Sequence, residues 1–227
     1  MATSAGRTQN ALRKRQVAKE LWEHERTEFG HLGTLVGVDE AGRGCLAGPV
    51  YAAAVVLDGD YISWAGVADS KQLSRRQRES VYEEINARAV AIGRGMASAR
   101  EVDHLNVLQA SMLAMSRALR DLSLFPDVAL IDGPHVPAPN LTEVACVPVI
   151  HGDARCISIA AASIIAKVER DWLMDKLGRL YPKYGFENHA GYGTAAHLDA
   201  LRRYGPCKEH RLTFAPVRAL ENTSGGA

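Results

Sequence analysis

The alternation of apolar and polar residues predicts a chain that switches repeatedly between short strands and amphipathic helices. Short apolar runs bounded by glycine, proline or charged residues are typical of strands, and they cover residues 35–38, 50–57, 88–98, 128–131 and 144–150. Longer segments repeat their apolar residues at helical spacing, and they cover residues 74–88, 105–122, 157–180 and 194–204. This order predicts an α/β fold, in which helices flank a central mixed sheet and a mostly helical C-terminal portion follows.

The two ends of the chain differ from its middle. Residues 1–30 are polar and charged with scattered helix formers, and they predict a helical or partly disordered extension. The Arg13-Lys14-Arg15 run within it is either a nucleic-acid contact or a solvated helix face. Residues 218–227 end in Gly-Gly-Ala and predict a flexible tail. The globular domain is therefore expected between residues 31 and 217.

Composition narrows the class of protein only in part. No run of apolar residues is long enough for a membrane span, and the N-terminus has no apolar core for a signal peptide. We therefore expect a cytoplasmic protein without a membrane partner. The formal net charge is only +1, so any binding of nucleic acid must depend on local clusters of charge. The cysteines lack the paired spacing of zinc or disulfide frameworks, and we expect reduced thiols at Cys45, Cys146, Cys156 and Cys207.

Acidic residues follow three of the predicted strands. Asp39 and Glu40 follow the first apolar run, Asp132 follows the run 128–131, and Asp153 comes shortly after the run 144–150. Sites in open α/β sheets gather beyond strand ends, and converging carboxylates suit a hard cation such as Mg²⁺ or Mn²⁺. Two such ions about 3.5–4 Å apart clamp the attacking and leaving oxygens in phosphoryl transfer. This arrangement of acids suggests metal-dependent cleavage of a phosphodiester.

Each acid also has a structural interpretation. Asp132 precedes Gly133, which is common turn chemistry, and Asp153 suits the N-cap of the following helix. Asp39 and Glu40 are adjacent, so they point to opposite faces of a regular strand and reach one site only if the strand ends there. The spacing alone leaves the metal site and the structural interpretation both open.

Several blocks of sequence resemble, in order, the motifs of the ribonuclease HII family. They are GVDEAGRGCLAGPV at 37–50, DSKQLS at 69–74, LIDG at 130–133, GDAR at 152–155, SIAAASIIAKVERD at 158–171, HAGYGT at 189–194 and HRLTF at 210–214. The resemblance covers about residues 34–217. It implies a ribonuclease H-like fold whose catalytic domain spans residues 31–217. One departure is Pro134-His135, where many relatives carry a polar residue after the Asp-Gly pair.

The resemblance also implies roles for individual residues. Asp39, Glu40, Asp132 and Asp153 fall on the four metal-binding catalytic acids of the family. Gly42, Arg43 and Gly44 fall on the loop that reads the ribose 2′-hydroxyl and nearby phosphates, and Tyr192 falls on the tyrosine that packs against the sugar at the RNA–DNA junction. The chemistry of these residue types agrees with the implied roles, because glycine permits close approach of the backbone to a sugar and arginine is a forked donor to phosphate. Further candidates for substrate contact are Ser70, Lys71, Lys167, Arg170 and Arg211.

Two more residues in these blocks have expected places outside the acid site. Asp171 is a fifth acid, but it lies about five helical turns beyond Asp153 and is expected to be too distant to join the same metal pair. His210 has two possible roles, which are to orient the C-terminal segment or to shuttle protons.

The expected activity is cleavage on the 5′ side of a ribonucleotide embedded in duplex DNA, and of the RNA strand in RNA–DNA hybrids. The reaction would use two Mn²⁺ or Mg²⁺ ions, leave 3′-hydroxyl and 5′-phosphate ends, and serve ribonucleotide removal and primer processing by a monomer. A structure-specific DNA nuclease on the same fold, such as a junction resolvase, is a second interpretation that needs the acids but no ribose sensor. A non-catalytic nucleic-acid-binding module is a third, which the intact set of acids disfavours.

Overall fold

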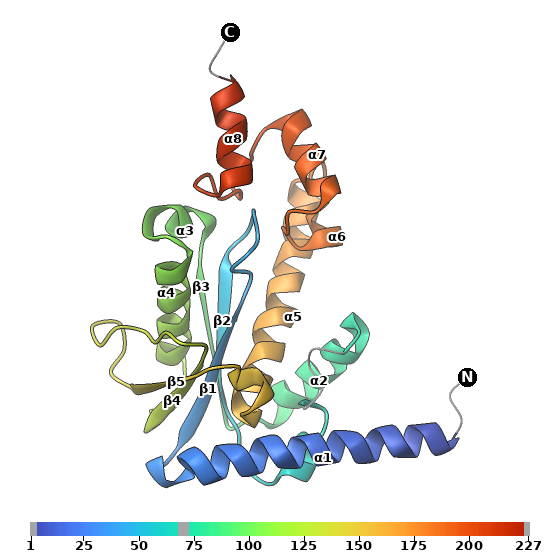
Figure 1. Ribbon diagram of the computed structural model, residues 1–227, viewed down its shortest axis with the longest axis vertical. Helices are drawn as coiled ribbons and strands as arrows, with labels where there is room; N and C mark the ends of the chain where they lie inside the picture. Colours follow the sequence, from blue (N-terminus) through green and yellow to red (C-terminus); the bar gives the residue numbers. More distant parts are fainter. Residues whose placement is uncertain (1–3, 68–72, 225–227) are drawn as a thin grey trace.

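The computed structural model describes residues 4–67 and 73–224 and is built around one five-stranded mixed sheet. The strand order is β3-β2-β1-β4-β5 (Figure 1). The strands are β1 (Leu35–Ala41), β2 (Val50–Val56), β3 (Ala91–Ala97), β4 (Val128–Asp132) and β5 (Ala145–Val149). β1 pairs antiparallel with β2 and parallel with β4, so the predicted α/β class with a mixed sheet is confirmed. β5, which contains Pro148, lies at an edge as the proline predicts.

Helices cover both faces of the sheet. They are α1 (Ser4–Phe29), α2 (Arg75–Arg88), α3 (Ala99–Leu105), α4 (Val107–Arg120), α5 (Ile157–Leu180), α6 (Phe186–His189), α7 (Ala195–Tyr204) and α8 (Ala215–Ser224). α3 and α4 lie on one face, and α5 with α2 on the other, while α6, α7 and α8 gather at the end opposite α1 (Figure 1). None of the helices in the described ranges is long and apolar enough to cross a membrane.

Glycines in the strands set how closely the helices approach. A Cβ on Gly37 of β1 would lie 2.2 Å from the Ser158 carbonyl carbon of α5. On β3, a Cβ on Gly93 or Gly95 would lie 2.0 or 2.1 Å from a carbonyl oxygen of α4. The sequence interpretation that Gly93 and Gly95 weaken a strand is therefore incomplete, because their lack of a side chain is what lets α4 pack directly on the sheet.

The predicted helix 105–122 corresponds to α4, which begins and ends two residues inside the predicted bounds. Asn106, with a φ of 70°, separates α4 from the short helix α3 that precedes it. The Asn106 side chain accepts hydrogen bonds from the backbone N–H groups of Leu108 and Gln109, which makes it the N-cap of α4. The short helices α3 and α6 have no counterpart among the predicted segments.

The N-terminal helix α1 is part of the domain rather than a separate extension. Its residues Ala18 and Leu21 are buried against the core, and Figure 1 shows it crossing one end of the molecule. Glu25 is only 6% exposed and accepts hydrogen bonds from the backbone N–H and hydroxyl of Ser158, at the start of α5. The helical part of the prediction for residues 1–30 is confirmed over residues 4–29.

α8 extends as far as Ser224 and so covers part of the segment 218–227 that is predicted to be a flexible tail. Val217 is fully buried and forms a cluster with Leu46 and Leu201, so the helix has an apolar anchor in the C-terminal part of the molecule. The last three residues, 225–227, lie outside the described part of the chain.

Candidate active site

The register between β1 and β4 places two of the predicted acids side by side. Parallel pairing ends with Val38 opposite Ile131, so Asp39 and Asp132 are the next residues of the two neighbouring strands. Val38 and Ile131 belong to the cluster with α4 on one face of the sheet. The side chains that follow them point to the opposite face, which α5 covers. Asp39 is 7% exposed, and its carboxylate is hydrogen-bonded to the hydroxyl of Ser163 on α5.

Asp153 lies next to Asp132 through the connection between β5 and α5. The backbone N–H groups of Gly152 and Asp153 point at Asp132 Oδ1, with distances of 2.7 and 3.4 Å. Asp153 is not the N-cap of α5, because the cap residue is Cys156 and its side chain makes no capping bond. Glu25 of α1 supplies that interaction instead. The capping interpretation of Asp153 is therefore wrong.

Glu40 interacts by charge with Asp39 and Asp132 and lies one residue before the end of β1. The strand stops at Ala41, directly before Gly42, so it ends beside the acidic pair as a shared site requires. Pairing with β4 has already stopped at Val38, so β1 and β4 separate beside the acids. Glu40 Oε1 accepts a hydrogen bond from Arg43 Nη1 at 3.2 Å, which holds the carboxylate near the exposed guanidinium.

The electrostatics of this cluster suit a divalent cation. Burial raises the pKa of Asp39 well above its usual range, and the charges of Glu40 and Asp132 raise it further. Burial also raises the pKa of Glu40, although Arg43 opposes the shift. Carboxylates that repel one another in a buried site are stabilised by a hard cation. Within residues 4–67 and 73–224, no three His, Cys, Asp or Glu side chains are close enough to form a preformed ion cage.

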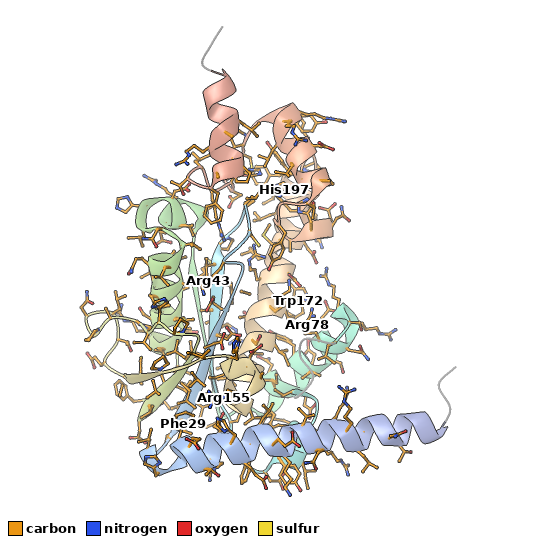
Figure 2. The ribbon with its side chains drawn as sticks, viewed as in Figure 1. Phe29, Arg43, Arg78, Arg155, Trp172 and His197 are labelled. Carbon is orange, nitrogen blue, oxygen red and sulfur yellow. The ribbon has the colours of Figure 1, made fainter. Side chains whose placement is uncertain are left out.

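The Gly42–Arg43–Gly44 loop follows the acids and joins the C-terminal part of the molecule. The Leu46 N–H donates to Gly191 O at 2.8 Å, and Leu46 O accepts from the backbone N–H of Arg211 at 2.8 Å. Arg43 is exposed (Figure 2), and a Cβ on Gly44 would meet nothing within 4 Å. This side of the loop is therefore open to a ligand, while its other side is docked on residues 191–211.

Two arginines predicted to contact phosphate instead hold this loop. Arg170 is fully buried, and its guanidinium donates to the carbonyl oxygens of Ala47, Pro49 and Ala190. The prediction that Arg170 contacts substrate is therefore wrong. Helical spacing indicates the burial of Arg170, because this residue lies four positions from Ala166 and four from Met174 on the same helix face, and both of those residues are fully buried.

Arg211 is buried in the same way. Its guanidinium donates to the carbonyl oxygens of Gly42, Arg43 and Gly48 at 2.8–3.0 Å. It therefore holds the backbone of the predicted ribose-reading loop from the protein interior and is not a phosphate contact. Gly42 adopts a φ of 94°, and a Cβ there would lie 1.9 Å from Arg170 Nε, so only glycine permits this packing.

Tyr192 faces solvent beside this loop. Its side chain is 44% exposed and is hydrogen-bonded to the buried Cys45, the residue after Gly44. Lys167 Nζ lies 6.0 Å from the centre of the Tyr192 ring and 2.6 Å from Asp171 Oδ1. The loop and the tyrosine, which are about 150 residues apart in the chain, therefore meet at one surface. Ser70 and Lys71 lie outside the described residues, and their predicted contacts stay predictions.

Sequence reasoning missed two groups that bond to site residues. Ser163 binds Asp39 from the buried face of α5, where its position in a mostly apolar helix was the available signal. His197 binds the backbone of Tyr192, and no sequence pattern marks that contact.

Comparisons with known proteins identify the family of this chain. The family model described as Ribonuclease HII matches residues 36–217. Ribonuclease HII 1 of Methylibium petroleiphilum is 53% identical over 189 residues, covering 83% of this chain and 93% of the relative. Ribonuclease HII of Delftia acidovorans is 51% identical over 185 residues, covering 82% and 77%. The crystal structure of ribonuclease H2 from Pyrococcus horikoshii OT3 superposes with a TM-score of 0.69 at 25% identity, covering 84% of this chain and 98% of that one. The chain therefore belongs to the ribonuclease HII family and is a metal-dependent endoribonuclease.

Proposed function

We propose that this protein hydrolyses the phosphodiester on the 5′ side of a ribonucleotide embedded in duplex DNA, and cuts the RNA strand of RNA–DNA hybrids. The products are 3′-hydroxyl and 5′-phosphate ends, and the reaction uses two Mg²⁺ or Mn²⁺ ions. The observation that carries the proposal is the β1–β4 register, which sets Asp39 beside Asp132 on the face covered by α5. Asp153 and Glu40 adjoin this pair through a backbone hydrogen bond and through charge.

Asp39, Glu40, Asp132 and Asp153 would hold the cations. When bound, the ions supply a water nucleophile of lowered pKa and stabilise charge on the reacting phosphate. Ser163 holds the Asp39 carboxylate in place, and the Gly152 N–H does the same for Asp132. Arg43, which is bonded to Glu40, supplies an exposed forked donor for a phosphate next to the acids.

Recognition of the ribose is assigned to the surface between the loop and Tyr192. The open backbone at Gly44 admits a sugar closely, and a 2′-hydroxyl is the group that separates RNA from DNA. The exposed ring of Tyr192 offers an apolar face for the adjacent deoxyribose. Lys167 stays a candidate phosphate contact, since its ammonium lies beside this ring.

The proposal is tested by a nicking assay with the purified protein. The substrates are a duplex with one ribonucleotide, a uniform RNA–DNA hybrid and an all-DNA duplex, each with Mg²⁺, Mn²⁺ or a chelator. We expect cleavage 5′ to the ribonucleotide only with a metal, and none of the all-DNA duplex. Asp132→Asn should retain substrate binding and lose at least about a hundredfold in cleavage rate. Equal nicking of all-DNA duplex, or full activity of Asp132→Asn, would refute the proposal.

The same assay separates the other interpretations. A structure-specific DNA nuclease would keep its substrate preference in Tyr192→Ala, whereas a ribose sensor would lose it. A binding module would bind the duplexes and cut none of them. Participation in ribonucleotide removal and primer processing, a monomeric state and a cytoplasmic location stay predictions.

A further inference from the structure

Three histidines form a cluster behind the Tyr192 segment, and two of them are buried. His197 is fully buried and His210 is 2% exposed, and their rings lie 5.2 Å apart between centres. His189 stacks on His197 at 4.5 Å. The cluster lies at the end of the molecule built from α6 and α7, where Figure 2 labels His197. The hydrogen bonds of these rings run to the backbone of Tyr184, Gly191, Tyr192 and Cys207 and between His197 and His210.

The backbone partners of the cluster determine where each proton lies. His210 Nδ1 accepts from the backbone N–H of Cys207 at 2.9 Å, so the His210 proton is on Nε2. That nitrogen faces His197 Nε2 at 3.0 Å, which must therefore accept. His197 then carries its proton on Nδ1 and donates it to the carbonyl oxygen of Tyr192 at 2.9 Å. A one-directional chain of hydrogen bonds thus runs from Cys207 through both rings to Tyr192.

This arrangement requires both rings to be neutral. A second proton on His197 would lie on Nε2 and face the Nε2–H of His210 across the 3.0 Å contact, and a second proton on His210 would lie on Nδ1 and face the backbone N–H of Cys207 at 2.9 Å. Burial lowers the pKa of His197, and His189 lowers it further. Burial, with a smaller contribution from His197, brings the pKa of His210 to about 4. The titratable groups facing the pair are Tyr184, Cys207 and His189. Burial raises the pKa of Tyr184 and of Cys207, so neither adds a charge near pH 7. The chain therefore persists through the neutral range.

The carbonyl at the end of the chain belongs to a strained turn. Ala190 has a φ of 47° and Gly191 a φ of 81°, so two successive residues are left-handed just before Tyr192. A non-glycine residue keeps such a conformation only where its surroundings hold it. Arg170 binds Ala190 O, Leu46 binds Gly191 O, and His197 binds Tyr192 O. Tyr192 O also accepts from the backbone N–H of Thr194 at 2.8 Å, so His197 is the side chain that, together with this N–H, fixes the Tyr192 carbonyl.

We propose that His197, oriented by His210, is a positioning residue for Tyr192 and thereby sets the selectivity for the RNA–DNA junction. This inference rests on the proposed function, in which the exposed Tyr192 ring contacts the sugar at that junction. His197 touches no substrate and acts through the Tyr192 backbone. When its hydrogen bond is lost, the turn relaxes and the ring no longer holds one orientation beside the Gly42–Gly44 loop.

A matched pair of variants tests the role of one nitrogen. In His197→Asn the amide nitrogen lies near the position of Nδ1 and keeps the donor to Tyr192 O. In His197→Gln the amide lies near Nε2, keeps the contact with His210 and loses that donor. The measurement is the ratio of kcat/KM for the single-ribonucleotide duplex to kcat/KM for a uniform RNA–DNA hybrid, with Tyr192→Ala as the reference. Thermal unfolding of both variants checks that they fold.

We expect His197→Gln to lower this ratio about tenfold, the effect of one lost hydrogen bond, mostly through KM for the single-ribonucleotide duplex. His197→Asn should stay within about threefold of the unmodified protein. Equal ratios in the two variants, whether both kept or both lost, would overturn the positioning role. If the unmodified protein shows no ribonucleotide-dependent cleavage, the proposed function fails, and the next measurement still decides whether the histidine chain exists.

That measurement needs no variant. Nitrogen-15 NMR of the histidine side chains at pH 7.5 distinguishes the two neutral tautomers. We expect the Nδ1–H form for His197 and the Nε2–H form for His210 and His189. An Nε2–H form for His197 would overturn the proposal, because no proton would then face Tyr192 O.

Discussion

Replacing Arg211 with methionine removes a buried cation that organises the predicted ribose-reading loop. The guanidinium is fully buried and donates to the carbonyl oxygens of Gly42, Arg43 and Gly48. Burial lowers the pKa of Arg211 to about 10, so the side chain stays charged at neutral pH. Methionine has a similar length and no donor, and it therefore leaves these three oxygens inside the protein without their partners.

The size of the effect follows from those three oxygens. An unsatisfied buried acceptor costs about 1–3 kcal/mol, so three cost about 3–9 kcal/mol. Part of this is offset, because the variant no longer has to bury a charge. We expect a net loss of about 3–5 kcal/mol in the free energy of unfolding, a large part of the 5–15 kcal/mol typical of a domain. Cleavage should fall as well, since the loop next to Glu40 loses its support.

Urea unfolding followed by circular dichroism measures this loss, and the nicking assay measures the activity. Arg203→Met on the exposed surface of α7 is the matched control and should stay within about 0.5 kcal/mol of the unmodified protein. Arg211→Lys should also be unstable, because a single ammonium cannot span three oxygens. Stability and nicking in Arg211→Met equal to those of Arg203→Met would refute this reasoning.

Three further predictions concern stability. Gly37→Ala should lower the free energy of unfolding in urea by about 3 kcal/mol, because its Cβ would lie 2.2 Å from the α5 backbone. Gly44→Ala is the control and should cost less than about 1 kcal/mol, because its Cβ would meet nothing within 4 Å. Equal losses in the two variants would contradict the packing argument. Glu25→Ala should cost about 1–3 kcal/mol, measured by thermal unfolding, because it leaves the N–H and hydroxyl of Ser158 without their acceptor; an unchanged melting temperature would show that α1 does not cap α5. Stability should fall as the pH drops from about 6.5 to 4, by up to about 3 kcal/mol from His210, because its folded pKa of about 4 lies below the unfolded value and the unfolded chain takes up the proton first. Urea midpoints across this range should fall less in His210→Gln, and an identical fall would exclude His210 as the cause.

Local patterns predicted elements whose residues decide their own conformation. The apolar repeat over 157–180 predicts α5 with both ends in place, and Ser74 with Gln77 forms the capping box that begins α2 at the expected position. The predicted helix 105–122 begins two residues before α4, because its apolar repeat continues across Asn106, which leaves the helical conformation. α8 was missed for a different reason, since its buried anchor Val217 is meaningful only once Leu46 and Leu201 are beside it.

In the candidate site, too, local patterns predicted some features and only the tertiary structure decided others. The acids at strand ends and the resemblance of the motifs identified which residues to place together, and those assignments need only the order of residue types along the chain. The roles of Arg170 and Arg211 could not be obtained in this way. A cation in a motif looks the same whether its donors face a phosphate or a backbone carbonyl, and only burial separates the two.

By itself the sequence predicted the α/β class, because class depends on periodicity, and the resemblance of its ordered motifs pointed to the family and to the four candidate acids. The tertiary structure alone decided that β4 leaves β1 after Val38, that α1 caps α5, and that the loop at Gly42–Gly44 meets Tyr192. Each of these contacts joins residues far apart in the chain, and its strength depends on burial and on the distance between partners. The spacing of residues along a strand or helix determines neither the burial of a contact nor the distance between its partners.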